Sequence, residues 1–437
     1  MRRLPLSAYR LPLSALRLPL LALAAACAPT PPDPARLDPI AVRYVELTLG
    51  MRHHDPDFVD AYYGPDSLKA RADADTLTVA EIGAAADSLL AVLGDAVPTY
   101  ADSLVAMRHR YLVGQLTAVR TRARMLGGEK LAFDEEARLL YGVTVPSFPE
   151  THFDSLVARL GELLPGEGDI GTRYNAFKAQ VMLPPERVDT VFKVAIAACR
   201  ARSNQHIALG ADERFDLEYV TGTSWNAYNW YKGGLRSLIQ VNLDFPIPVD
   251  RAVDLACHEG YPGHHVYNAS LEQALVRDRG WVEFSVYALF SPQSLVAEGS
   301  ANFGIDMAFP GEDRTIFERE FLMPLAGIDP SLAAKNAEVR VVMERLNYAR
   351  NEVARRYLDG AIDSTQAIAL MQRWWFQSPE AAAKTLRFIR NYRAYVINYN
   401  LGRDLVAAWV QREGGDDPAR RWAAFGTLLA TPPRALQ

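Results

Sequence analysis

The sequence predicts a mostly α-helical protein, built as one large unit with a small β-sheet. Apolar residues recur at helical spacing over most of the chain from Asp38 onward, which is the main signal for amphipathic helices. Strand candidates are few, and the clearest is an apolar run at 235–242 that Pro246 and Pro248 bring to an end. The chain has 437 residues, 49% of them hydrophobic and 23% charged, which is ordinary for a globular protein with a large core. Its length also allows two or three domains, but we expect a single helical domain over residues 38–437.

The first 37 residues are expected to lie outside this domain. An apolar run at 18–26 follows several arginines and ends in Leu23-Ala24-Ala25-Ala26-Cys27, which is typical of a secretory signal. This ending resembles a bacterial lipobox, in which the cysteine is acylated and becomes the mature amino terminus. The alternative is a plain signal that is cleaved after an alanine. We therefore expect a signal peptide over 1–27, a Pro-rich extended tether over 28–37, and an exported protein that is periplasmic or lipid-anchored to a bacterial membrane.

Composition and charge limit the partners that the chain is expected to have. The formal net charge is −5, so the basic footprint of a nucleic-acid-binding protein is missing. No other stretch has the ~20 apolar residues that a membrane-spanning helix needs, so membrane contact is expected only through an amino-terminal lipid. The three cysteines, Cys27, Cys199 and Cys257, are too few for a disulfide framework, and Cys257 is expected to be a small core residue. The oligomeric state is left open.

The helices are expected in the following order. The first covers about 40–49, and a second begins at Thr78, where Glu81 three residues later completes the pattern of a capping box. A long helical run covers 100–126, and Pro185 lies near the first turn of a helix that extends to about 209. A helix at 249–259 follows the strand candidate. The remaining helices are expected at 294–308, 329–360, 363–376, 379–401 and 417–429.

The chain's most informative segment is Cys257-His258-Glu259-Gly260-Tyr261-Pro262-Gly263-His264-His265, at the end of the expected helix 249–259. A His-Glu pair followed by a further His is how zinc peptidases build a site: two imidazoles hold Zn²⁺, and the Glu accepts a proton from the water that the metal activates. Many such enzymes place a strand beside the metal helix, and the free edge of that strand pairs with an extended peptide.

The spacing departs from the usual HExxH, so the second imidazole has two candidates. On a regular helix His265 lies within ~20° of the face of His258, whereas His264 lies about 120° away, which slightly favours His265. Pro262 cannot sit in a regular helix without loosening the preceding turn. A bulge at Tyr261-Pro262-Gly263 would add residues and bring His264 to the position of the second ligand instead.

Three blocks of the sequence resemble a known family. His258-Glu259-Gly260-Tyr261-Pro262-Gly263-His264-His265 resembles the signature of the bacterial domain-of-unknown-function family numbered 885, relatives of the zinc peptidases. Glu298-Gly299-Ser300-Ala301 is similar to that family's Glu-Gly block, although Ser300 and Asn302 stand where Trp and Tyr are expected. Tyr399-Asn400-Leu401-Gly402 resembles its Tyr-x-x-Gly block. The resemblance covers most of the chain from about Asp38.

The resemblance implies a mostly helical, gluzincin-like zinc metallopeptidase whose third metal ligand is Glu298. Independently, two imidazoles require a third protein ligand, with the fourth position left to water. In related enzymes with longer spacings a glycine directly precedes the second ligand, and Gly263-His264 fits that pattern. We therefore assign His258, His264 and Glu298 as the metal ligands. His265 is then expected to donate to the substrate or the oxyanion, and Tyr399 to serve one of the same two roles.

Other polar residues have weaker expectations. Asp254 or Asp306 would orient the imidazole of His258, or else face solvent. A peptide carboxylate would suit the arginine-rich stretch after residue 379, although such a face is usually solvated; its members are Arg387, Arg390 and Arg393.

These observations predict a zinc-dependent hydrolase of peptide bonds in peptides, with Glu259 as the general base that later protonates the leaving amine. One alternative is hydrolysis of an amide or ester that is not a peptide. Another is a lipid-anchored binding protein on the same fold without catalysis, and the intact His-Glu pair argues against it. The sequence does not indicate whether the enzyme trims amino ends, trims carboxyl ends or cuts internally.

Overall fold

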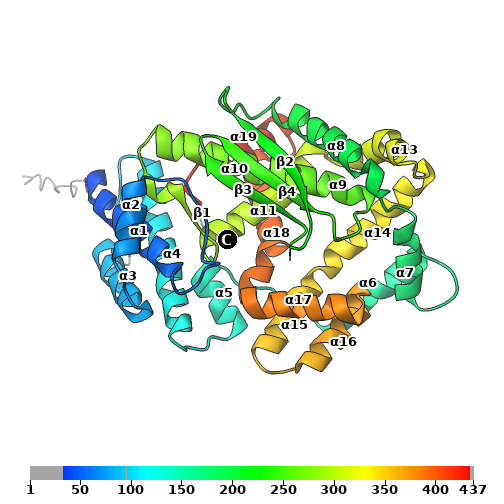
Figure 1. Cartoon of the computed structure of the whole chain (residues 1–437), viewed down its shortest axis with the longest axis horizontal. Helices are drawn as coiled ribbons and strands as arrows, with labels where there is room; N and C mark the ends of the chain where they lie inside the picture. Colours follow the sequence, from blue (N-terminus) through cyan, green and yellow to red (C-terminus); the bar gives the residue numbers. More distant parts are fainter. Residues whose placement is uncertain (1–32, 95, 224, 434–437) are drawn as a thin grey trace, which may run out of the picture.

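A computed structural model describes residues 33–94, 96–223 and 225–433 (Figure 1). It is mostly helical, as predicted, and it has two small sheets where one was expected. The helices before the main sheet are α1 (Asp38–Met51), α2 (Asp66–Ala74), α3 (Val79–Leu93), α4 (Ser103–Leu126), α5 (Phe133–Tyr141), α6 (Glu150–Leu163), α7 (Ile170–Ala179) and α8 (Val188–Ser203). Those after it are α9 (Val249–Leu255), α10 (His264–Leu271), α11 (Pro292–Ala308), α12 (Asp313–Phe317), α13 (Met323–Ala326), α14 (Ala333–Leu346), α15 (Tyr348–Leu358), α16 (Ser364–Trp375), α17 (Pro379–Tyr392), α18 (Leu401–Gly414) and α19 (Pro418–Leu429).

Local sequence signals explain several helix boundaries. The Thr78 hydroxyl accepts a hydrogen bond from the backbone N–H of Glu81, and the Glu81 carboxylate accepts one from the backbone N–H of Thr78, so the predicted capping box begins α3. The expected helix 329–360 is divided at Asn347 into α14 and α15. No helix among the described residues is long and apolar enough to cross a membrane. The expected signal peptide, Cys27 and most of the tether lie outside the described residues.

The main sheet contains three strands in the order β2-β4-β3, where β2 is Arg214–Val220, β3 is Ala227–Gly233 and β4 is Arg236–Asn242. The strand predicted at 235–242 is β4, but it pairs in parallel with β2 and antiparallel with β3. Its expected free edge therefore does not exist, because both of its edges are already hydrogen-bonded. The outer strands were not predicted, and they make β4 the central strand of the sheet.

A second sheet and a disulfide complete the frame around the histidine segment. β1 (Val59–Tyr62) pairs antiparallel with β5 (Val286–Ala288), which joins the amino-terminal helices to the middle of the chain. Cys199 on α8 forms a disulfide with Cys257, the residue before His258. The expectation that Cys257 is only a small core residue was therefore incomplete. It is fully buried, and it also ties the histidine segment covalently to α8.

Two helices cross at glycines that belong to separate sequence blocks. A Cβ at Gly299 of α11 would lie 2.4 Å from the carbonyl oxygen of Gly402 on α18, and a Cβ at Gly402 would lie 2.7 Å from that of Leu295. Any side chain at this crossing would separate the two backbones. The Glu-Gly and Tyr-x-x-Gly blocks thus meet in space, and they place Glu298 and Tyr399 near each other.

Candidate metal centre

The helix that carries His258 is interrupted, not merely kinked. After α9 the backbone widens into a π-helical turn at Ala256–Gly260, passes through a cis Tyr261–Pro262 bond and begins again as α10 at His264. The prediction placed the bulge at 261–263, and the widened turn lies just before it. A π turn adds a residue to the helix and re-aims those that follow.

Gly263 permits the chain to return this closely. Its N–H donates to the carbonyl oxygen of Cys257 at 2.9 Å. A Cβ at this position would lie 1.9 Å from the carbonyl oxygen of His258, far inside contact distance. Only glycine fits such an approach of backbone to backbone. The consequence is that His264 turns toward His258, with their ring centroids 4.6 Å apart.

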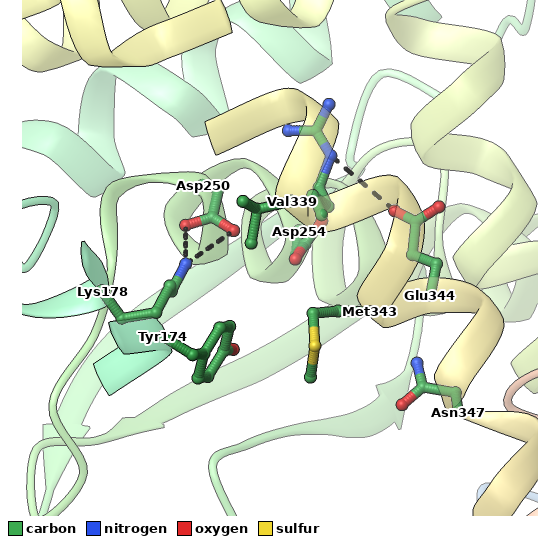
Figure 2. A pocket seen from close by; sticks show the side chains of 9 residues that line it. Tyr174, Lys178, Asp250, Asp254, Val339, Met343, Glu344 and Asn347 are labelled. Carbon is green, nitrogen blue, oxygen red and sulfur yellow. Dashed lines mark hydrogen bonds and ion pairs between the residues drawn. The ribbon is translucent and has the colours of Figure 1, made fainter. Parts of the chain in front are cut away.

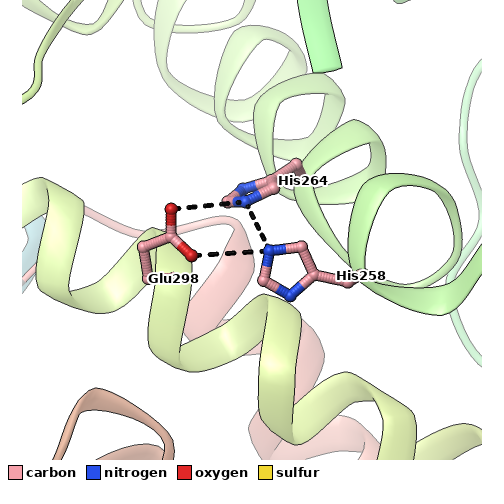
Figure 3. A group of neighbouring side chains, drawn as sticks. All are labelled: His258, His264 and Glu298. Atoms are coloured by element: carbon pink, nitrogen blue, oxygen red, sulfur yellow. Dashed lines mark hydrogen bonds and ion pairs between the residues drawn. The ribbon is translucent and has the colours of Figure 1, made fainter. Parts of the chain in front are cut away.

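The structure brings His258, His264 and Glu298 together into a group that can hold a metal ion (Figure 3). The two Nε2 atoms lie 3.1 Å apart, Glu298 Oε2 lies 3.4 Å from His258 Nε2, and Glu298 Oε1 lies 3.7 Å from His264 Nε2. Ligand atoms about 2.1 Å from a tetrahedral zinc ion lie about 3.4 Å from one another. The three separations bracket that value, so little movement is needed for all three groups to reach one ion.

The carboxylate of Glu298 supports the same interpretation. The residue is 7% exposed, and its Oε2 is shielded from solvent without a hydrogen-bond partner. Its Oε1 accepts a hydrogen bond from the Tyr395 hydroxyl at 2.8 Å. Burial raises the pKa of Glu298, but the neighbouring imidazoles and the Tyr395 hydroxyl outweigh it and leave the pKa below its usual value. A buried ionised oxygen without a partner is costly, and a cation would satisfy it.

Asn302 holds the ring of His258 in place. Its Oδ1 lies 3.1 Å from His258 Nδ1, and its Nδ2 donates to the carbonyl oxygen of Tyr399 at 3.0 Å. Because the amide oxygen can only accept, Nδ1 carries the proton, and Nε2 presents a lone pair to the centre. From the sequence, Asn302 was noted only as a departure from the family pattern; this role was not predicted, although Asn302 lies one helical turn after Glu298.

Neither aspartate expected in this orienting position occupies it. Asp254 pairs with Arg314 at 2.8 Å, and Asp306 pairs with Arg403 at 2.6 Å. Both carboxylates are thus engaged by arginines and not by an imidazole.

His265 does not join the centre, in contrast to its expected role with substrate or oxyanion. The side chain is 0% exposed. Its Nε2 donates to the Glu213 carboxylate at 2.7 Å, and its Nδ1 lies 2.8 Å from the Ser237 hydroxyl. Glu213 directly precedes β2 and Ser237 lies on β4, so His265 anchors α10 to the sheet. Neither ring nitrogen is left to bind a substrate.

Glu259 directly follows His258, and Tyr399 contacts Tyr395, which donates to Glu298. Glu259 is 5% exposed, and its burial raises the pKa of its carboxyl to about 7 even though His258 nearby acts to lower it. The Tyr399 ring packs edge-on against Tyr395 at 5.7 Å between centroids. Burial, followed by the charge of Glu298, raises the pKa of Tyr399 well above its usual value, so the phenol keeps its proton.

A polar cavity of about 130 Å³ lies beside the helix that leads to the centre (Figure 2). It is lined from α9 by Asp250 and Asp254, and from α14 and its end by residues that include Glu344 and Asn347. Lys178 of α7 pairs with Asp250 at 3.1 Å within it. The cavity therefore lies between α7, α9 and α14.

Comparison with known proteins gives a likeness in fold. No family model matches the chain, and no curated protein matches it. A protein of Colwellia psychrerythraea described as a candidate lipoprotein has a similar structure, with a TM-score of 0.50 at 15% identity, over 90% of this chain and 73% of that one. A protein named CHT (TM-score 0.47, 12% identity, 91% and 90% covered) and an M32 carboxypeptidase from Deinococcus radiodurans R1 (0.37, 14%, 90% and 90%) are more distant. At such identities the first likeness shows the fold alone, and the other two carry no argument about this chain.

Proposed function

We propose that the protein is a zinc-dependent hydrolase of peptide bonds in peptides. The observation that carries the proposal is the convergence of His258, His264 and Glu298, whose ligand atoms all lie within 4.8 Å of one another, with one Glu298 oxygen left without a partner. Two imidazoles and one carboxylate are the donor set of catalytic zinc sites that leave a fourth position open. A divalent ion bound there would polarise the scissile carbonyl and make water acidic at neutral pH.

The roles of the chain's own residues follow from their positions. His258, His264 and Glu298 hold the ion, and Asn302 and Tyr395 orient the ligands by the hydrogen bonds described above. Glu259 takes a proton from water as the water oxygen bonds to the scissile carbonyl carbon. It then delivers that proton to the leaving nitrogen as the C–N bond breaks, which yields a carboxylate and an amine.

Tyr399 is assigned to the oxyanion or the substrate. Its hydroxyl keeps a proton at neutral pH, so it can donate a hydrogen bond to an oxygen that gains negative charge. The sequence blocks shared with the family numbered 885 agree with a gluzincin-like enzyme. The amino-terminal pattern agrees with an exported protein, periplasmic or anchored through lipid on Cys27.

One experiment tests the proposal directly. The purified protein is analysed for bound metal, and it then digests a peptide library with and without a chelator. We expect one zinc per chain and cleavage that is lost with the chelator and restored by zinc. Zinc without peptide cleavage, but with turnover of non-peptide amides or esters, would replace the substrate class. A protein that binds zinc but turns over neither class would be a binding protein.

A further inference from the structure

A partly buried arginine without an ion-pair partner lies close to the candidate metal centre. Arg350 is on α15, and its Nε is shielded from solvent and has no hydrogen-bond partner. Two more deeply buried arginines have carboxylate partners: Arg108 pairs with Glu283 at 2.5 Å, and Arg122 pairs with Asp55 at 2.7 Å. Arg173, whose Nε also lacks a partner, donates instead to the backbone carbonyls of Gly161 and Leu164. Among the described residues, no carboxylate lies within ion-pair distance of the Arg350 guanidinium. A buried charge without a partner is unfavourable, so Arg350 lacks a counter-ion that the chain itself does not supply.

The surroundings hold the guanidinium in a defined place. Its central carbon lies 5.2 Å from the ring centroid of Trp375, a cation–π arrangement that restrains the plane of the group. Burial lowers the pKa of Arg350, and the positive charge of Arg251 lowers it further. Because the ordinary pKa of an arginine side chain is far above neutral pH, the guanidinium of Arg350 remains a cation there.

Three observations place Arg350 near the candidate metal centre. Helix α15 packs against the 3₁₀ segment Arg393–Asn398, which carries Tyr395, the donor to Glu298. The charges of Glu298 and Glu259 raise the pKa of Tyr399, and the charge of Arg350 lowers it. The cavity of Figure 2 reaches Asn347, one helical turn before Arg350.

Building on the proposed peptidase activity, we propose that Arg350 binds the free α-carboxylate of the peptide substrate, which makes the enzyme a carboxypeptidase. A guanidinium matches a carboxylate with two parallel hydrogen bonds. The terminal carboxylate belongs to the residue directly after the scissile bond, about one Cα–Cα step of ~3.8 Å away, so its receptor must lie next to the metal centre. Water adds to the carbonyl carbon, the C–N bond breaks, and the products are one free amino acid and a peptide shortened by one residue.

The arginines expected for this role from the sequence do not fill it. Arg393 is bound to Glu136 at 2.6 Å, and Arg387 and Arg390 are exposed. Arg350 differs from them because it is partly buried and unpaired.

The test compares two peptides of the same sequence, one with a free terminal carboxylate and one with a terminal amide. The wild-type zinc enzyme is expected to cleave the free acid from its carboxyl end and to cleave the amide at least ~10-fold more slowly, since a charged hydrogen bond is lost. Arg350→Gln is expected to lower kcat/KM for the free acid by about 10- to 100-fold and to lower the amide rate by a much smaller factor. Arg350→Lys retains the charge and is expected to lose less.

Arg345→Gln is the matched control, because Arg345 is exposed on α14 and its loss removes the same charge. We expect wild-type rates from it. Equal cleavage of acid and amide by the wild type, release of internal fragments, or equal loss of both rates in a zinc-loaded Arg350→Gln protein would each overturn the carboxylate role while leaving the peptidase. Zinc binding without cleavage of either peptide would instead overturn the proposed function, and this inference with it. The acid–amide comparison needs no variant, so it decides the question even if Arg350→Gln does not fold.

Discussion

Replacement of Gly263 by alanine is expected to destroy the metal site without touching any ligand. The added Cβ would lie 1.9 Å from the carbonyl oxygen of His258 and 2.4 Å from that of Cys257. The obstacles are backbone atoms of the turn that carries the first ligand, so no side-chain rotation relieves the clash. Ordinary contact at 3.4 Å requires a shift of about 1.5 Å, whereas metal–ligand distances tolerate only about 0.2 Å.

The assay is zinc affinity, measured by competition with a chelator that reports free zinc. We expect Gly263→Ala to lose at least ~100-fold in affinity, since His258 and His264 can no longer reach one ion. Gly83→Ala is the control: it lies within α3, where a Cβ would meet only Ala123 Cβ at an ordinary 3.7 Å. A Gly263→Ala protein with wild-type zinc affinity and turnover would refute the argument that the close backbone return sets the site.

The remaining predictions are smaller in scope. His264→Ala is expected to abolish zinc binding. His265→Ala is expected to keep zinc and to lose about 3 kcal/mol of stability in thermal or denaturant unfolding, because the buried Glu213 and Ser237 side chains lose their partner. The reverse pattern would contradict the assignment of His264 as the metal ligand. Glu259→Gln is expected to keep zinc and to lose ~10²–10⁴-fold in kcat, and full activity in the zinc-loaded variant would remove Glu259 from the mechanism. Burial raises the pKa of Asp254, but Arg314 and other arginines outweigh it and hold the pKa below its unfolded value. This carboxylate therefore stabilises the fold above the unfolded pKa, and the stabilisation is lost as pH falls. The stability of Asp254→Asn is expected to depend less on pH below about pH 4 than that of the wild type, and an equal pH dependence in unfolding curves would count against this prediction. Cys199→Ser opens a covalent loop with a sequence separation of 58 and is expected to cost about 4 kcal/mol by the same unfolding measurement, a prediction that an unchanged midpoint would contradict.

The parts of the molecule that the sequence could predict depend on local signals. Helical spacing of apolar residues identified most helices, and the Thr78–Glu81 pair located the start of α3. At the centre, Pro262 pointed to an interruption of the helix, and the glycine before His264 favoured that histidine as the second ligand. The candidate ligand set then followed from chemistry and from a family resemblance. Its convergence in space is a property of the structure, and its metal occupancy remains a prediction.

The parts that the sequence could not predict depend on contacts between distant segments. β3 is rich in aromatic and polar residues without clear alternation, so neither it nor the central place of β4 was expected. His265 is adjacent in sequence to His264 but faces the sheet, which only the orientation of α10 decides. Asn302 instead of an aspartate orients His258, because nearby arginines bind both aspartates.

Two further features are tertiary in the same sense. The disulfide joins cysteines 58 residues apart, and no local pattern shows that their backbones meet. Arg350 has no distinguishing motif, and it becomes notable only because its Nε has no hydrogen-bond partner and no carboxylate of the described residues pairs with it.

The most direct test of the central claim is the coordination of zinc in the purified protein, measured by X-ray absorption at the zinc edge and located by anomalous diffraction from crystals. The account predicts two imidazole nitrogens and one carboxylate oxygen at about 2.0–2.2 Å, with the ion between His258, His264 and Glu298. Zinc bound at another place, or an ion held by His265 in place of His264, would contradict it.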